Sequence, residues 1–114
     1  MSRCLNSIKT NLAKNFDTEV IVVDNFSTDG SAERAAEKFP WVKVIKNKKN
    51  AGFAAANNIG VKNSSGNYLL FANPDIEILP RSIDLMMGHL KNNSDLAAVA
   101  PQIISEDGSI YPSC

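Results

Sequence analysis

The sequence has no net charge and no long apolar run, and each absence argues against a class of protein. Its 12 Lys and Arg residues balance 12 Asp and Glu residues, so no overall field holds nucleic acid or an anionic membrane surface. No apolar run approaches the roughly 18 residues of a membrane span. The N-terminus lacks the apolar core of a signal peptide. We therefore expect a cytoplasmic chain that does not bind nucleic acid.

Cysteine and histidine are scarce, which limits the available chemistry. Cys4 and Cys114 lie at opposite ends and fit no zinc-binding spacing, so we expect unpaired thiols in a reducing compartment. His89 has no Cys or carboxylate at catalytic spacing, and no Ser-His-Asp triad is evident. The chain also lacks GxGxxG and Walker A motifs, so dinucleotide and P-loop sites of the usual kind are not supported.

The composition is that of one soluble globular domain covering residues 1–114. Hydrophobic residues make up 44% of the chain and charged residues 21%, which disfavours disorder. The predicted helices cover residues 3–15, 29–39, 53–63 and a segment from Pro80; the predicted strands cover 19–24, 42–45 and 68–72, with weaker candidates at 96–100 and 102–105. Ser27 or Thr28 is the predicted N-cap of the second helix.

Strands that alternate with helices predict an α/β fold with a mostly parallel sheet and helices on both faces. The run Val20–Val23 is apolar and β-branched throughout, which is typical of a strand buried on both sides. In such sheets ligands bind beyond the carboxyl ends of the strands. Two predicted strands end there in polar residues, at Asp24 and at Asn73-Pro74-Asp75, and we expect Asp24 and Asp75 to face one crevice.

Each polar strand end has two interpretations. An ionised Asp24 accepts hydrogen bonds, which suits the N–H groups of a pyrimidine base or the hydroxyls of a ribose; alternatively it is a solvated cap of the next helix. Asp75, assisted by Asn73 or Glu77, offers the oxygen ligands of a hard cation such as Mg²⁺. The alternative is a proline-containing turn in which Asn73 and Asp75 bond to their own backbone.

The small-residue helix predicted at 53–63 adds two features. Its N-terminus at Gly52 can face an anion. Asn57 and Asn58 are poor choices for a helix interior, so we expect at least one of them to have a polar partner in the site. The lysines of the preceding loop, at positions 46, 48 and 49, fit a solvated loop better than a phosphate clamp.

Taken in order, three segments resemble the inverting GT-A glycosyltransferases of family 2. They are Val20–Gly30, Asn50–Gly60 and Gly66–Asp75. The Asn-Pro-Asp variant and the closing Asp107-Gly108-Ser109 look most like the rhamnosyltransferase-type branch. The resemblance implies a Rossmann-like GT-A fold that binds a nucleotide-diphosphate sugar.

The resemblance also implies roles for individual residues. Asp24 matches the acid that contacts the nucleotide base, and Asn57 looks like the residue of the small-residue helix that reaches the nucleotide. Asp75 matches the last acid of the DxD motif, which holds the diphosphate and a divalent cation, Mg²⁺ or Mn²⁺. Asn73 stands where the family more often has the first acid, and an amide there removes a charge from the metal site.

The resemblance implies transfer of a sugar to a hydroxyl of a saccharide or lipid-linked acceptor, with inversion at the anomeric carbon. The rhamnosyltransferase-type branch suggests rhamnosyl transfer in surface polysaccharide synthesis. Family members begin with a strand absent here, and their catalytic base lies beyond residue 114. We therefore expect the nucleotide-sugar-binding half of an enzyme that in full length can be peripheral at the inner membrane face. The alternative is a non-catalytic nucleotide-binding or partner-binding module.

The absent strand would lie between the segments 19–24 and 68–72. Unpaired buried backbone groups cost on the order of 1–3 kcal/mol each, so we expect the gap to close. Direct pairing of the two segments is the simplest solution. The others are a different segment in the slot, or a homodimer formed by strand swapping or edge pairing.

Overall fold

The computed structural model describes residues 1–11 and 16–111, and its centre is a two-stranded parallel sheet. Strand β1 (Val20–Asp24) pairs with β2 (Val42–Lys46), with Val20 opposite Val42 and Asp24 opposite Lys46. The helices are α1 (Ser2–Asn11), α2 (Ser31–Lys38), α3 (Phe53–Lys62) and α4 (Ser82–Asn92). The α/β fold with a parallel sheet is confirmed.

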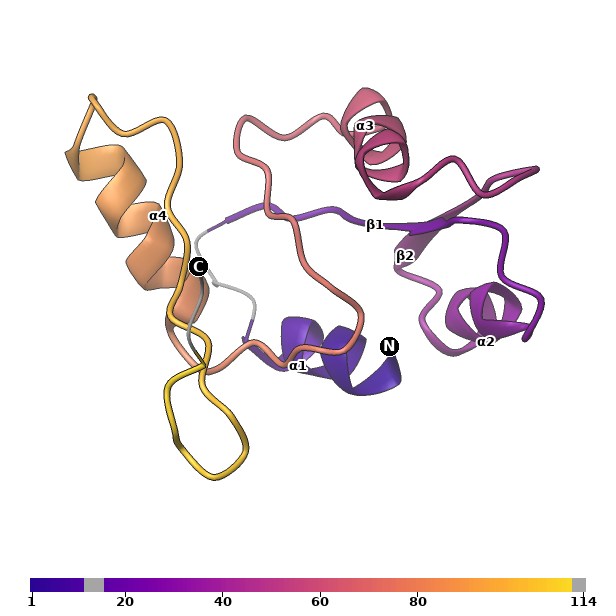
Figure 1. Ribbon diagram of the computed structural model, residues 1–114. Helices are drawn as coiled ribbons and strands as arrows, with labels where there is room; N and C mark the ends of the chain where they lie inside the picture. Colours follow the sequence, from indigo (N-terminus) through magenta and orange to yellow (C-terminus); the bar gives the residue numbers. More distant parts are fainter. Residues whose placement is uncertain (12–15, 112–114) are drawn as a thin grey trace.

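The main core lies on the face of the sheet covered by α1 and α2 (Figure 1). The side chains of Leu5 and Ile8 on α1 are buried with Phe39, which follows α2. Val20 and Val22 of β1 pack against this cluster. Alternate residues of a strand point to opposite faces, which is why these two valines share one side.

Helix α3 covers the opposite face of β1 (Figure 1). A Cβ built on Gly60 would lie 3.5 Å from Cγ2 of Val23, so the helix backbone runs close to the strand there. The sheet therefore has helices on both faces, as predicted. None of the residues of α3 is fully buried, so this layer is thinner than the one formed by α1 and α2.

The prediction of a strand at 68–72 is wrong, because these residues do not form a strand. The chain from α3 passes β1 as an irregular segment and then descends to α1 (Figure 1). Its four large apolar residues are about half exposed, at 49% for Tyr68, 48% for Leu69, 50% for Leu70 and 59% for Phe71. Direct pairing of this segment with β1, expected from the sequence, is therefore also wrong.

Contacts just after this segment hold the next part of the chain on α1 and so draw it away from the sheet. Beyond it, the Cys4 thiol on α1 donates to the Asn73 carbonyl (3.6 Å). Ile78 is buried, and its N–H donates to the Ser7 hydroxyl (2.9 Å) while its carbonyl accepts from the Asn11 side chain (2.8 Å). The chain after residue 72 is thus bound to α1 rather than released to extend the sheet.

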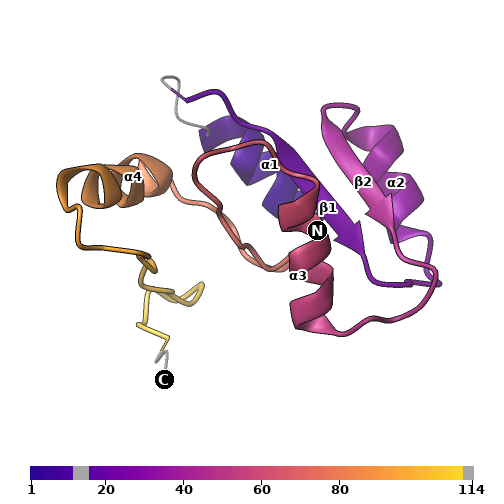
Figure 2. The ribbon, with the colours of Figure 1, turned by 90° about the horizontal axis from the view of Figure 1, so that it is seen from above.

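The C-terminal part also departs from the prediction. The weak strand candidates at 96–100 and 102–105 do not form strands; the chain makes one isolated antiparallel bridge between Ile104 and Ile110, around the predicted turn at 106–109. Helix α4 and the chain that follows it lie to one side of the β1–β2 unit in both views (Figure 1 and Figure 2). No helix in residues 1–11 and 16–111 has the length and apolar character needed to span a membrane.

Two smaller expectations have mixed outcomes. The N-cap of α2 is Gly30, at φ 71°, rather than Ser27 or Thr28. Asp29 still lies at the positive end of the helix, where its Oδ1 accepts the Ser31 N–H (2.9 Å). Cys4 is an unpaired thiol as predicted; it is also buried, and burial raises its pKa. Cys114 lies outside the described residues.

Glu19 ties the chain after α3 to the start of β1, and this contact makes stability depend on pH. The backbone N–H and the hydroxyl of Ser65 donate to its carboxylate, and these bonds hold the pKa of Glu19 below its ordinary value of 4.5. A lowered folded pKa contributes stability that is complete above the unfolded pKa and is lost as the pH falls through the folded one. Glu19→Gln should therefore flatten the loss of stability on acidification.

The measurement is the urea concentration at the midpoint of unfolding, determined at several pH values from about pH 6 down to about pH 3. The matched control is Glu37→Gln, which changes an exposed glutamate of α2 that has no hydrogen-bond or ion-pair partner in the described part of the chain. Equal acid-side slopes for the Glu19 and Glu37 variants would contradict the role assigned to Glu19.

Candidate functional site

Three asparagines join the loops at the carboxyl end of the sheet, and we call them the asparagine clasp: Asn25, Asn47 and Asn50. Oδ1 of Asn25 accepts hydrogen bonds from the Asn47 side-chain amide (3.1 Å) and from the Ala51 backbone (2.9 Å). Nδ2 of Asn25 donates to Oδ1 of Asn50 (2.7 Å). An amide both donates and accepts, so one side chain can link the loop after β1 to the loop after β2.

The clasp also fixes the start of α3. Oδ1 of Asn50 accepts the Gly52 N–H (2.9 Å), and Gly52 is the N-cap residue of α3 with φ 84°. A residue with a side chain adopts that conformation only at a cost, whereas glycine adopts it freely. The carboxyl end of β1 and the N-terminus of α3 are therefore held in one place, where the helix has no acidic residue in its first turn.

Asp24 lies in the middle of this arrangement. Its carbonyl accepts the Asn47 N–H (2.9 Å), and its Oδ1 accepts the Ser27 N–H (3.2 Å). The Ser27 bond lies within the loop and does not cap α2, which begins at Ser31, so it is not the helix cap that the alternative interpretation expected. Within residues 1–11 and 16–111 no other group donates to this carboxylate, so the half-buried side chain keeps acceptor capacity for a ligand.

Asn57 lies in the second turn of α3 and is half-buried, whereas Asn58 is exposed. Neither side chain forms a hydrogen bond to another described residue. The expected polar partner is therefore not a protein group of this part of the chain. A ligand contact of Asn57 stays a prediction.

Asn73 and Asp75 lie on a turn that precedes α4 in the chain and is bonded to α1 through the Asn73 carbonyl. The Ile76 N–H reaches the Asn73 carbonyl (3.5 Å), which closes the turn expected around Pro74. Both side chains are exposed and accept no hydrogen bond from the described residues. Among residues 1–11 and 16–111 no hydrogen bond or ion pair joins this turn to Asp24, and the shared crevice stays a prediction.

The two side chains fit a divalent cation in type but offer little charge. One carboxylate and one amide oxygen are hard ligands that Mg²⁺ accepts while it keeps several waters. Their backbone groups, and not their side chains, hold the turn, so the side-chain oxygens are available. No group of three or more His, Cys, Asp or Glu residues is placed to hold a metal in the described ranges. A cation here would therefore depend on substrate phosphates for further ligands.

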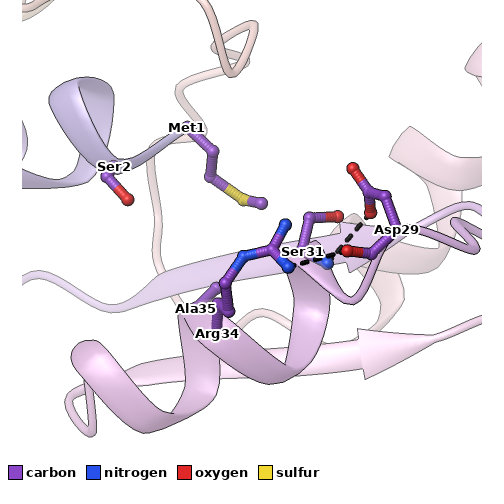
Figure 3. Close-up of a pocket in the computed structure, with 6 residues that line it drawn as sticks. All are labelled: Met1, Ser2, Asp29, Ser31, Arg34 and Ala35. Atoms are coloured by element: carbon purple, nitrogen blue, oxygen red, sulfur yellow. Dashed lines mark hydrogen bonds between the residues drawn. The ribbon is translucent and has the colours of Figure 1, made fainter.

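A pocket of about 300 Å³ lies between the start of α1 and α2 (Figure 3). Its polar groups are already bonded to one another: the Arg34 guanidinium donates to the Asp29 carbonyl (2.7 Å), and Ser31 holds the pKa of Asp29 below its ordinary range. The pocket is lined by Met1, Ser2, Asp29, Ser31, Arg34 and Ala35. It contains none of the predicted site residues, so we do not assign the ligand site to it.

The sequence analysis missed the clasp. It assigns no role to Asn25, Asn47 or Asn50, and in the loop before the small-residue helix it considers only the lysines. The available signal is an asparagine directly after each of two strand ends and another two residues before the glycine that caps α3. Such spacing indicates loops that meet at one sheet edge, but only the fold shows which amides bond.

A parallel α/β sheet with polar loops gathered at its carboxyl edge is the arrangement of a ligand-binding α/β protein, and comparison with known proteins identifies the family. The family model described as "Glycosyl transferase family 2" matches residues 1–113. The chain therefore belongs to glycosyl transferase family 2. No solved structure matches it significantly.

Three curated relatives show the breadth of the likeness. The chain is 29% identical over 113 residues to the N-acetylglucosaminyl-diphospho-decaprenol L-rhamnosyltransferase of Mycobacterium tuberculosis, covering 90% of this chain and 37% of the relative. It is 34% identical over 90 residues to the dolichol-phosphate mannosyltransferase of Pyrococcus furiosus, covering 76% and 25%. It is 32% identical over 92 residues to an uncharacterized glycosyltransferase of Haemophilus influenzae, covering 81% and 30%. The chain thus spans well under half the length of each.

Proposed function

We propose that this chain is the nucleotide-sugar-binding half of an inverting GT-A glycosyltransferase. The family match carries the proposal, because it runs over residues 1–113 and so includes Asp24, the start of α3 and the turn at Asp75 together. The clasp supports it, since the end of β1 and the N-terminus of α3 are fixed beside each other. A helix N-terminus favours a negative group such as a diphosphate.

In this proposal each predicted residue has a defined contact. Asp24 accepts hydrogen bonds from the base or the ribose, and Asn57 reaches the nucleotide from α3. Asp75, with Asn73, holds Mg²⁺ or Mn²⁺ at the diphosphate. A bound cation supplies positive charge that stabilises the leaving nucleoside diphosphate. The base that activates the acceptor hydroxyl is not proposed among residues 1–114, so the chain alone is expected to bind donor without transferring sugar.

We further propose a lipid-linked saccharide as acceptor and a rhamnosyl donor, in surface polysaccharide synthesis. The names of two relatives contain a polyprenyl group, decaprenol in one and dolichol phosphate in the other, and one of them is a rhamnosyltransferase. Such acceptors fit an enzyme that is peripheral at the inner face of a membrane.

A partner-binding module is the second candidate function, and one observation favours it. Tyr68, Leu69, Leu70 and Phe71 form a consecutive row of half-exposed apolar residues, and β1 pairs on one side only. An unpaired strand edge is a template for another strand. In this version a second copy joins the edge, by strand swapping or edge pairing, as a homodimer.

Titration of the chain with UDP, dTDP and GDP, each with and without Mn²⁺, tests the first proposal. We expect the amide signals of Asp24, Asn57 and Asp75 to shift with at least one nucleotide. Asp75→Ala should weaken the Mn²⁺-dependent binding about tenfold, because the one carboxylate of the turn is removed. Asn73→Asp should strengthen it, because a second carboxylate is restored. Calorimetry gives the affinities.

Asp95→Ala is the matched control, since it removes an exposed carboxylate outside the proposed site. Its affinities should equal those of the unsubstituted chain. Metal dependence that survives Asp75→Ala would contradict the metal assignment, and no signal shift at millimolar nucleotide would favour the partner-binding module.

A further inference from the structure

Phe26 combines two features that are costly to the folded chain. Its side chain is 55% exposed, although an aromatic ring gains free energy when it is removed from water. Its backbone has φ 74°, a left-handed conformation that is a genuine outlier for a bulky residue. Packing against the described residues, 1–11 and 16–111, gives no reason for a phenylalanine here.

The residues on both sides of Phe26 explain how the conformation is maintained. Asn25 is fixed by the clasp, through bonds to Asn47, Asn50 and the Ala51 backbone. The Ser27 N–H is fixed by its bond to the Asp24 carboxylate (3.2 Å). A strained residue persists where its surroundings determine its conformation, and such residues concentrate at ligand clamps.

We propose that Phe26 is a stacking platform for the base of the bound nucleotide, an inference that rests on the proposed function. Asp24, two residues earlier at the end of β1, offers an acceptor for the N–H edge of a base or for the ribose. Phe26 offers a flat apolar face for the ring itself. Bases stack on aromatic side chains with a gain that is similar for every base, because each has a π face.

The strained backbone has a purpose in this arrangement. A ring carried on an anchored loop loses little conformational freedom when the ligand binds, so less affinity is lost to ordering. The ring should therefore strengthen binding of any nucleoside diphosphate, while the choice among bases depends on hydrogen bonds such as those of Asp24.

The test compares two substitutions and two ligands. Phe26→Asn removes the ring and keeps a residue that tolerates the left-handed conformation, whereas Phe26→Tyr keeps the ring. The ligands are the nucleoside diphosphate that binds best, and inorganic pyrophosphate with the same cation, which has no base. We expect Phe26→Asn to weaken nucleotide binding about tenfold and to leave pyrophosphate binding unchanged. Phe26→Tyr should bind both ligands with affinities within about twofold of those of the unsubstituted chain.

Thermal unfolding supplies a second readout, because a ring kept for binding should not be needed for folding. Phe26→Asn should unfold at the same temperature as the unsubstituted chain or at a higher one. Nucleotide affinity that Phe26→Asn leaves intact, or an equal loss for pyrophosphate, would overturn the platform alone. An unsubstituted chain that binds no nucleotide would overturn the proposed function, and the platform with it.

Discussion

Backbone amides of Leu69, Leu70 and Phe71 are expected to exchange with solvent deuterium at least about 100-fold faster than those of α2 near Ala35. The structure gives these three N–H groups no hydrogen-bond acceptor in the described residues, and their side chains are about half exposed. Helix α2 differs in both respects, since Ala35 is buried and its carbonyl accepts the Phe39 N–H (2.9 Å). Hydrogen exchange followed by NMR measures both regions in one sample.

The experiment is informative because it separates three arrangements of the sheet. Protection of 69–71 at low protein concentration would mean that the segment pairs directly with β1, against the structure. Protection that appears only at high concentration would indicate strand addition between two copies. Rapid exchange at both concentrations is the result expected from the structure.

The segment 68–72 also shows where prediction from the sequence fails. Its apolar, aromatic residues have the same local preference for a strand as the run in β1, and local preference was the basis of the prediction. A strand also requires a neighbour that supplies ladder hydrogen bonds, and this requirement is not local. Here the Cys4 and Ser7 contacts of α1 hold the chain that follows, at Asn73 and Ile78.

The elements that were predicted correctly depend on short-range patterns. Strands β1 and β2 lie on either side of α2 in the chain, and such a strand–helix–strand unit specifies its own parallel pairing. Helix α1 likewise follows a short-range pattern, since Leu5 and Ile8 have the spacing of one helix face and both are buried. The candidate site could be predicted in part: Asp24 lies at the expected strand end, and α3 begins at Phe53, directly after Gly52. The hydrogen bonds among the asparagines depend on which side chains meet when the loop after β1 lies beside the loop after β2, and residue patterns do not encode that.

Asn25→Ala is expected to lower the free energy of unfolding by about 2 kcal/mol. The substitution removes the acceptor for the Asn47 side chain and the Ala51 N–H, and the donor to Asn50. Each such bond contributes about 0.5–1.5 kcal/mol net, and the partly exposed location of the clasp keeps the sum in the lower part of the range. Urea unfolding gives the value from the shift in midpoint at constant slope.

Asn25→Asp is the matched variant, because it keeps the acceptor oxygen and loses only the donor to Asn50. It should recover more than half of the lost stability, since two of the three bonds need only an acceptor. Asn67→Ala is the control, because Asn67 is an exposed loop residue without a hydrogen-bond partner among residues 1–11 and 16–111. This variant should change the free energy of unfolding by no more than about 0.5 kcal/mol. If Asn25→Ala were as mild as Asn67→Ala, the clasp would not be what fixes the loop, and the strained backbone of Phe26 would need another support. A large loss in Asn25→Ala that Asn25→Asp restores would instead identify the two accepted bonds as the contacts that hold the end of β1 against the start of α3.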